Sequence, residues 1–189
     1  MVHRPGGADF APGAYVFPGG AVHEQDRAWP DEIAGAAIRE TFEETGILLA
    51  QDATARDPER VRELVRNGET FASALQHAGI TPDFDSLVVF ARWVTPALLR
   101  RRFDTRFYVA RTPSGQDVHP QEGEVTDWLW ISPRRALDTD ELTLVYATRT
   151  ILESVADHRD PVAWAKSLRD IATVEPRLVQ GEAGWTIEH

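Results

Sequence analysis

The chain has no cysteine among its 189 residues, and lysine occurs only once. The lack of cysteine excludes disulfides, thiolate metal sites and cysteine nucleophiles, and it fits the cytoplasmic location that we expect. No apolar run is long enough to span a membrane, and the first residues carry no apolar signal region. Positive charge is scarce, because 20 Lys and Arg residues stand against 30 Asp and Glu residues, a net charge of −10. We therefore expect no membrane partner and no nonspecific nucleic-acid binding, which needs cationic side chains to neutralise phosphates.

Two common catalytic signatures are also missing. The sequence has neither a Gly-x-Ser-x-Gly elbow nor a Gly-x-x-x-x-Gly-Lys loop, which excludes nucleophile-elbow serine hydrolases and P-loop nucleotide binding. The six histidines show no spacing typical of metal ligands, so a zinc site is not expected. The remaining composition, 42% hydrophobic and 26% charged, is that of a globular protein, and we expect one domain over residues 1–189.

The most informative segment begins at Arg39 and reads Arg-Glu-Thr-Phe-Glu-Glu-Thr-Gly-Ile. At about 100° per residue, Glu40, Glu43 and Glu44 share one face of a helix, and apolar side chains share the opposite face. Like charges at these spacings repel by about 0.2–0.5 kcal/mol per pair. The acidic face is therefore either a solvated surface or a site for a divalent cation. We favour the cation, because a Pro-Gly-Gly turn upstream can direct backbone carbonyls toward an ion.

Residues 17–20, Phe-Pro-Gly-Gly, together with the acidic segment 39–47 resemble the Nudix box. That box has a glycine, five residues, a glutamate, seven residues, and then Arg-Glu-apolar-x-Glu-Glu-x-Gly-apolar. This sequence differs because Thr41 stands at an apolar position and because ten residues separate the last glycine of the turn from Asp31, where the box has glutamate. We expect the extra residues to enlarge the loop and Glu32 to share the role of the missing glutamate.

Residues 93–96 and 102–110 are similar to one branch of the family, which includes peroxisomal coenzyme A diphosphatases. The resemblance extends from about residue 10 to about residue 156. It implies a Nudix-like α/β/α sandwich with a mixed sheet, and we interpret residues 52–85 as a helical insertion.

The resemblance implies a hydrolase, dependent on Mg²⁺ or Mn²⁺, that cleaves the pyrophosphate bond of a nucleoside diphosphate linked to another moiety. Coenzyme A or a derivative is the candidate substrate. The implied catalytic residues are Arg39, Glu40, Glu43 and Glu44, and the implied metal ligands are the three glutamates and the Gly20 carbonyl. Glu40 could instead act as the general base, and Arg39 is expected to orient a carboxylate.

An acid outside the box commonly completes such a site. We expect Glu124 to be that ligand, in preference to Glu122, and the alternative for both is a solvated loop acid. A basic patch could bind substrate phosphates, although its side chains could instead form salt bridges with nearby acids; it consists of Arg100, Arg101, Arg102 and Arg106.

Aromatic side chains near this patch could stack on a base. Phe103 is the substrate-binding candidate, together with Arg102 and Arg106. Trp93 and Tyr108 are the others, and a core position is the alternative that we prefer for Tyr108. A second interpretation of the whole chain is a Nudix-like module that senses a nucleotide without cleaving it. Because all three acids of the box remain, we favour the enzyme.

The predicted elements follow from periodicity and from turn residues. We expect a loop at 21–29, with strands at 15–17, 86–94, 106–110 and 125–131 and helices at 31–45, 58–66, 70–78, 133–137, 141–156 and 161–171. The C-terminal part, 141–189, is expected to end in a hairpin over 177–188. Only about fourteen residues precede the first strand, where Nudix domains have a strand or two. Either the sheet is shortened, or the true start lies upstream, or another segment fills the gap, and the candidate segment is the hairpin, from this chain or from a partner in a homodimer.

Overall fold

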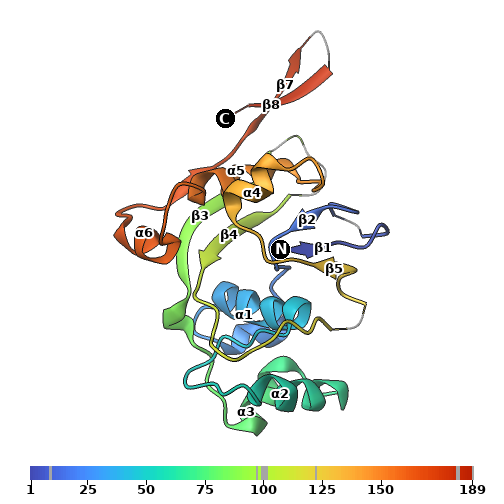
Figure 1. Cartoon of the computed structure of the whole chain (residues 1–189), viewed down its shortest axis with the longest axis vertical. Helices are drawn as coiled ribbons and strands as arrows, with labels where there is room; N and C mark the ends of the chain where they lie inside the picture. The colour runs from blue at the N-terminus through green and yellow to red at the C-terminus, as the bar shows by residue number, and fades with distance from the viewer. Residues whose placement is uncertain (9, 97, 99–101, 122, 182–183, 189) are drawn as a thin grey trace. The chain divides into compact units, whose positions relative to one another are not determined.

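The computed structural model describes all residues except 9, 97, 99–101, 122, 182–183 and 189 (Figure 1). The chain divides into two compact units. The first contains Met1–Leu87 and Arg111–Asp157, and the second contains Val88–Ala110 and His158–His189. No helix in the described part of the chain is both long and apolar enough to cross a membrane.

In the first unit, three short strands form an antiparallel sheet in the order β2-β1-β5. These are β1 (Val2–His3), β2 (Tyr15–Val16) and β5 (Asp127–Trp128). Val2 faces Val16 on one side and Trp128 on the other, and it is completely buried. Strand β1 is therefore a further strand ahead of β2, which leads into the glycine turn, and the sequence analysis did not predict it.

Helix α1 (Glu32–Thr45) confirms the predicted helix at 31–45. Asp31 caps its start by accepting hydrogen bonds from the amides of Ile33 and Ala34, which otherwise lack partners. Gly46 ends the helix at φ 75°, a conformation that favours glycine.

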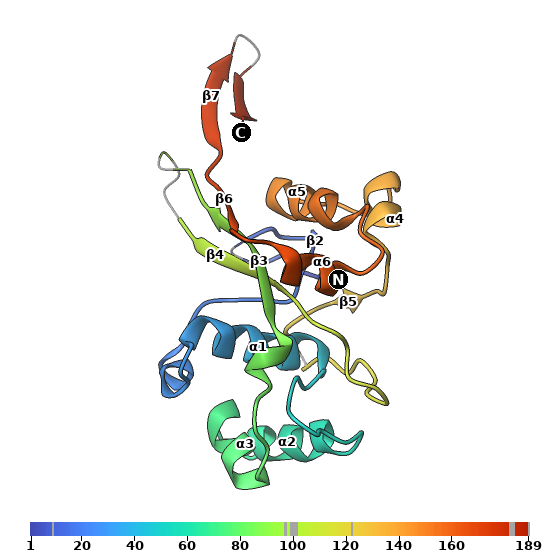
Figure 2. The ribbon, with the colours of Figure 1, turned by 90° about the vertical axis from the view of Figure 1, so that its left-hand side faces the viewer.

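The insertion consists of α2 (Asp57–Arg66) and α3 (Phe71–Ala78), close to the predicted helices at 58–66 and 70–78. The pair lies beside α1 in both views (Figure 1, Figure 2). Phe71 packs on Phe42 of α1 with the ring centres 5.2 Å apart, so the insertion shares a hydrophobic core with α1.

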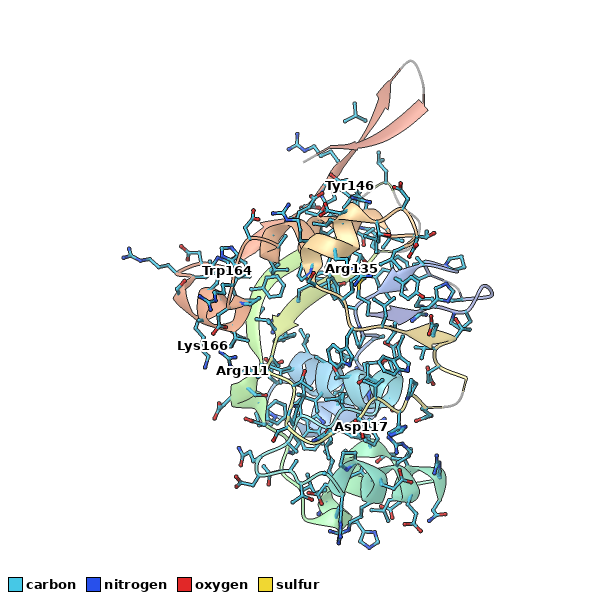
Figure 3. The ribbon with its side chains drawn as sticks, viewed as in Figure 1. Arg111, Asp117, Arg135, Tyr146, Trp164 and Lys166 are labelled. Atoms are coloured by element: carbon cyan, nitrogen blue, oxygen red, sulfur yellow. The ribbon has the colours of Figure 1, made fainter. Side chains whose placement is uncertain are left out.

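In the second unit, β3 (Val88–Val94) pairs antiparallel with β4 (Asp104–Val109) and parallel with β6 (Ala172–Val174). Helix α6 (Pro161–Ser167) projects Trp164 (Figure 3), whose ring packs against Phe90 of β3. The predicted mixed sheet is thus present. Strand β6 was not expected, and the predicted helix at 161–171 ends at Ser167.

The predicted hairpin is confirmed as β7 (Arg177–Gly181) and β8 (Gly184–Glu188). Among the described strands, these two pair only with each other. The prediction that this hairpin fills the gap before the glycine turn within its own chain is therefore wrong. Strand β1 fills it instead.

Three other predicted bounds were wrong, for identifiable reasons. The strand predicted at 125–131 shortens to β5 because its partner β1 has only two residues. The helix predicted at 141–156 is α5 (Tyr146–Val155), because Thr143 and Leu144 pair with Tyr15 in extended form. The loop expected at 21–29 contains the 3₁₀ helix η1 (Glu24–Ala28). The helix predicted at 133–137 is confirmed as α4 (Pro133–Asp138).

Candidate active site

Helix α1 carries the box acids on a face that is largely buried. Glu40 and Glu44 are 9% and 2% exposed, and Arg39 is completely buried. A solvated acidic surface would leave these side chains in water, so their burial disagrees with that alternative. Burial of several carboxylates is unfavourable unless other groups compensate their charge.

The glycine turn lies directly against two of these acids. A Cβ at position 20 would come within 2.3 Å of Glu40 Oε1, so the backbone approaches this carboxylate more closely than any other residue would allow. The amide of Gly19 donates a hydrogen bond of 3.0 Å to Glu44 Oε2. The turn and the helix therefore meet, as the sequence predicts.

Arg39 holds the other acids together. Its Nη1 donates to Glu40 Oε1 at 2.7 Å and to Glu43 Oε2 at 2.8 Å. Its Nε and Nη2 donate to the carboxylate of Asp26, and Nη2 also donates to the Ala21 carbonyl. Burial by itself would lower the pKa of Arg39, but the bond to Asp26 and the charges of Glu40 and Glu43 raise it above its ordinary value.

Sequence reasoning missed Asp26, which lies in η1 and is completely buried. We had expected Asp31 or Glu32 to replace the first glutamate of the box. Asp31 caps α1 instead, and Glu32 is half-exposed with its carboxylate 3.8 Å from Arg27 Nε. The structure therefore brings Asp26, and not Glu32, into contact with Arg39. The sequence signal for this residue was its position: Asp26 is an acid inside the lengthened loop, three residues after His23 at the start of η1.

Among the described residues, Glu44 has one cationic partner, Arg4, which sequence reasoning also missed. Arg4 Nη1 lies 3.3 Å from Glu44 Oε1, and Arg4 Nε is buried without a hydrogen-bond partner among the described residues. Burial raises the pKa of Glu44 to about 7, against the opposing effects of the Gly19 amide and Arg4. Burial likewise raises the pKa of Glu43, although Arg39 opposes it.

The loop between β4 and β5 brings a further acid to the site. Its backbone binds the end of α1: the amide of His119 donates to the Thr45 carbonyl, and the amide of Gln121 donates to the Glu43 carbonyl, both at 2.8 Å. These bonds satisfy carbonyls that have no partner inside the helix. The negative charge of Glu124 on this loop contributes to the raised pKa of both Glu43 and Glu44, so Glu124 lies within their electrostatic reach.

The same loop is held at two further points. Gln116 exchanges side-chain hydrogen bonds with the backbone of Leu48, and Arg62 of the insertion donates to the His119 carbonyl. Asp117 marks the course of this loop in Figure 3. Glu122, the alternative to Glu124, lies outside the described residues.

The residues fit a hard divalent cation by their chemistry. Four carboxylates, Glu40, Glu43, Glu44 and Glu124, influence one another beside a glycine turn, and carboxylate and carbonyl oxygens suit Mg²⁺ and Mn²⁺. The raised pKa values of Glu43 and Glu44 indicate that the protein does not fully compensate their negative charge. Within the described residues, no three acidic or histidine side chains already converge on one ion position. Arg39 binds Glu40, and Arg4 and the Gly19 amide bind Glu44.

The predicted substrate-binding residues belong to the second compact unit. Arg102 donates to the Thr95 carbonyl and lies 3.6 Å from Glu175, which agrees with the salt-bridge alternative. Phe103 is 37% exposed, and Arg106 lies on β4 opposite Arg92. Their role in substrate binding stays a prediction. Arg100 and Arg101 lie outside the described residues, and Trp93 is buried, in agreement with a core position.

Comparison with known proteins identifies the family. A family model described as the NUDT19 Nudix domain matches residues 23–142, more than half of the chain. A Caenorhabditis elegans relative, whose name places it among the nudix hydrolases, is 31% identical over 141 residues, which cover 73% of this chain and 48% of the relative. Acyl-coenzyme A diphosphatase NUDT19 of Homo sapiens is 32% identical over 133 residues, covering 58% of this chain and 35% of that protein. The Xenopus laevis protein of the same name is 26% identical over 202 residues, covering 73% and 53%.

The chain thus spans about half the length, or less, of these curated relatives. Among solved structures, a NUDIX hydrolase from Alicyclobacillus acidocaldarius matches with a TM-score of 0.69 and 27% identity, over 88% of this chain and 86% of that one. This likeness confirms the predicted α/β fold class. From the matched family model and these relatives, we conclude that the chain belongs to the Nudix hydrolase family.

Proposed function

We propose that this chain hydrolyses the pyrophosphate bond of coenzyme A or an acyl-coenzyme A, using Mg²⁺ or Mn²⁺. The observation that carries the proposal is the buried acidic face of α1 pressed against the glycine turn. Nudix hydrolases generally depend on divalent metals, and the relatives named acyl-coenzyme A diphosphatase suggest the substrate class. Coenzyme A is a nucleoside diphosphate linked to another moiety, as the sequence analysis expects.

We assign the metal ligands to Glu40, Glu43, Glu44, Glu124 and the Gly20 carbonyl. A bound divalent cation would neutralise charge on the pyrophosphate and lower the pKa of the attacking water. The chain's own residues prepare this chemistry. Arg39 fixes the carboxylates of Glu40 and Glu43.

The loop anchored on the end of α1 keeps Glu124 near Glu43 and Glu44. Burial excludes bulk water from Glu44, which strengthens its interaction with any cation that reaches it. Glu40 is assigned as a ligand, and the role of general base is its alternative.

The test is an assay of purified protein with coenzyme A, acetyl-coenzyme A, ADP-ribose, NADH and dinucleoside polyphosphates, each with Mg²⁺ or Mn²⁺. We expect coenzyme A substrates to yield adenosine 3′,5′-bisphosphate and a phosphopantetheine. The double variant Glu43→Gln/Glu44→Gln should fold and release no product. Full activity in that variant would refute the assignment of these ligands.

The same panel distinguishes the second interpretation. A module that senses nucleotides would bind one of these compounds, as measured by calorimetry, and release no product with any metal. Retention of all three acids of the box favours hydrolysis over sensing. Glu40→Gln tests Glu40 as the base, because loss of a base that is not a ligand would abolish turnover while Mn²⁺ binding persists.

A further inference from the structure

Arg39 and Asp26 form a saturated hydrogen-bonding unit. A guanidinium has five N–H groups, and each one of Arg39 has an acceptor. Nε donates to Asp26, Nη2 donates to Asp26 Oδ2 at 3.0 Å and to the Ala21 carbonyl at 2.8 Å, and Nη1 donates to Glu40 and Glu43. Because the guanidinium is planar, fixing its Nε and Nη2 edge also fixes the direction of both Nη1 hydrogens.

Asp26 is held firmly enough to fix that edge. It is completely buried, and its Oδ2 also accepts a 2.7 Å hydrogen bond from the His23 amide. The next turn of the loop packs on α1, because the Trp29 ring lies so close that a Cβ at Gly35 would come within 2.2 Å of it. The loop that carries Asp26 is therefore attached to the helix that carries Arg39.

The charges of Arg39 and its carboxylate partners do not cancel. One positive guanidinium contacts three carboxylates, those of Asp26, Glu40 and Glu43, and the Arg39 and Asp26 side chains are at most 1% exposed. Without the Asp26 carboxylate, Arg39 would direct its whole charge at the two glutamates, since little water screens it. With that carboxylate against Arg39, Glu40 and Glu43 keep more of their negative charge for a cation.

We propose that Asp26 is a positioning residue that orients Arg39 and offsets its charge, so that Glu40 and Glu43 can bind a divalent cation. This inference rests on the metal-dependent function proposed above. It assigns a role to the lengthened loop: the loop supplies the carboxylate that the box lacks at its usual position. Asp26 acts through Arg39, and no contact with substrate is implied.

The test compares Asp26→Asn with the charge-preserving Asp26→Glu. The matched control is Glu24→Gln, which removes the same charge from the same 3₁₀ helix, at an exposed side chain whose ion-pair partner is Arg27. Binding of Mn²⁺ alone is measured by electron paramagnetic resonance of the free ion, and kcat and KM are measured with acetyl-coenzyme A. Circular dichroism and thermal unfolding show which variants are folded.

We expect Asp26→Asn to weaken Mn²⁺ binding about tenfold or more and to lower kcat, with a smaller change in KM at saturating metal. Asp26→Glu should recover part of both losses, and the control should match the parent protein. A folded Asp26→Asn variant that binds Mn²⁺ as the parent does would overturn the proposal. Equal losses in both Asp26 variants would overturn the role of charge.

The Mn²⁺ measurement also separates this inference from the proposed activity. If the parent protein hydrolyses no compound yet binds Mn²⁺, the activity is wrong and the comparison of Mn²⁺ affinities still decides the role of Asp26. If Asp26→Asn does not fold, nuclear magnetic resonance of the parent protein decides. The Arg39 Nε–H signal, assigned by its loss in Arg39→Lys, should exchange slowly with water and persist on addition of Mg²⁺. Rapid exchange, or loss of the signal with Mg²⁺, would overturn the proposal.

Discussion

Replacing Glu44 with glutamine should stabilise the metal-free protein while abolishing hydrolysis. Glu44 is 2% exposed, and its cationic neighbour Arg4 is 3.3 Å away and partly exposed. Burial raises its pKa from 4.5 to about 7; the Gly19 amide and Arg4 lower it, and the charges of Glu40 and Glu124 raise it further. The folded protein therefore disfavours the ionised form of this side chain.

The sign of the pH dependence follows from proton binding. Between pH 4.5 and about 7, the folded state binds more protons at Glu44 than the unfolded state does, so the free energy of unfolding falls as pH rises. Below this pH window the Glu44 carboxyl is protonated in both states and does not change the free energy of unfolding. Above the window, its ionisation lowers the free energy of unfolding by the full amount. A shift from 4.5 to about 7, at about 1.4 kcal/mol per pKa unit, gives an upper bound of about 3 kcal/mol.

Glutamine has no charge and keeps an oxygen that can accept from the Gly19 amide. We therefore expect Glu44→Gln to exceed the parent in free energy of unfolding by up to about 3 kcal/mol at pH 8, and by little at pH 5. The assay is urea unfolding in EDTA from pH 5 to pH 8, and the raised pKa of Glu43 cancels because both proteins contain it. Glu63→Gln, an exposed position on α2, is the control.

Added Mn²⁺ should reverse the order, because a ligand that binds only the folded parent stabilises it. Parallel pH profiles for the parent and Glu44→Gln would refute the reasoning. So would equal stabilisation of both proteins by Mn²⁺.

Three further predictions concern the same site and the assembly. Arg39→Met leaves three carboxylates without their shared cation, and urea unfolding should show a loss of about 3–5 kcal/mol; a loss below about 1 kcal/mol would contradict the buried network. Gly20→Ala should lower kcat at least tenfold, because its Cβ would displace the Glu40 carboxylate. Gly19→Ala, where a Cβ meets nothing within 4 Å, should have the smaller effect, and the opposite ranking would refute this account. Light scattering tests the predicted homodimer, which a mass near the 21.1 kDa of one chain would refute.

Much of the central helix could be predicted from sequence because its signals are local. Asp31 caps its start, Gly46 ends it, and the apolar and acidic faces follow from helical periodicity. The meeting of Gly20 with Glu40 was also predictable, since the turn and the acids form one motif. Local sequence patterns were therefore sufficient to predict this part of the site.

The residues that were missed act over longer distances. Asp26 joins Arg39 across 13 positions, and Arg4 joins Glu44 across 40. Periodicity does not indicate which acid meets a buried arginine. Strand β1 has two residues, too few for an alternating pattern to emerge, and its pairing with β5 spans most of the chain.

Main-chain hydrogen bonds attach the loop that carries Glu124 to the end of α1. The amides of His119 and Gln121 donate them. Any amino acid except proline supplies such an amide. Side chains at these two positions could therefore be exchanged in engineering, or drift in evolution, while the acid keeps its place. Sequence variation at these two positions therefore need not disturb the cation site, as long as neither becomes proline.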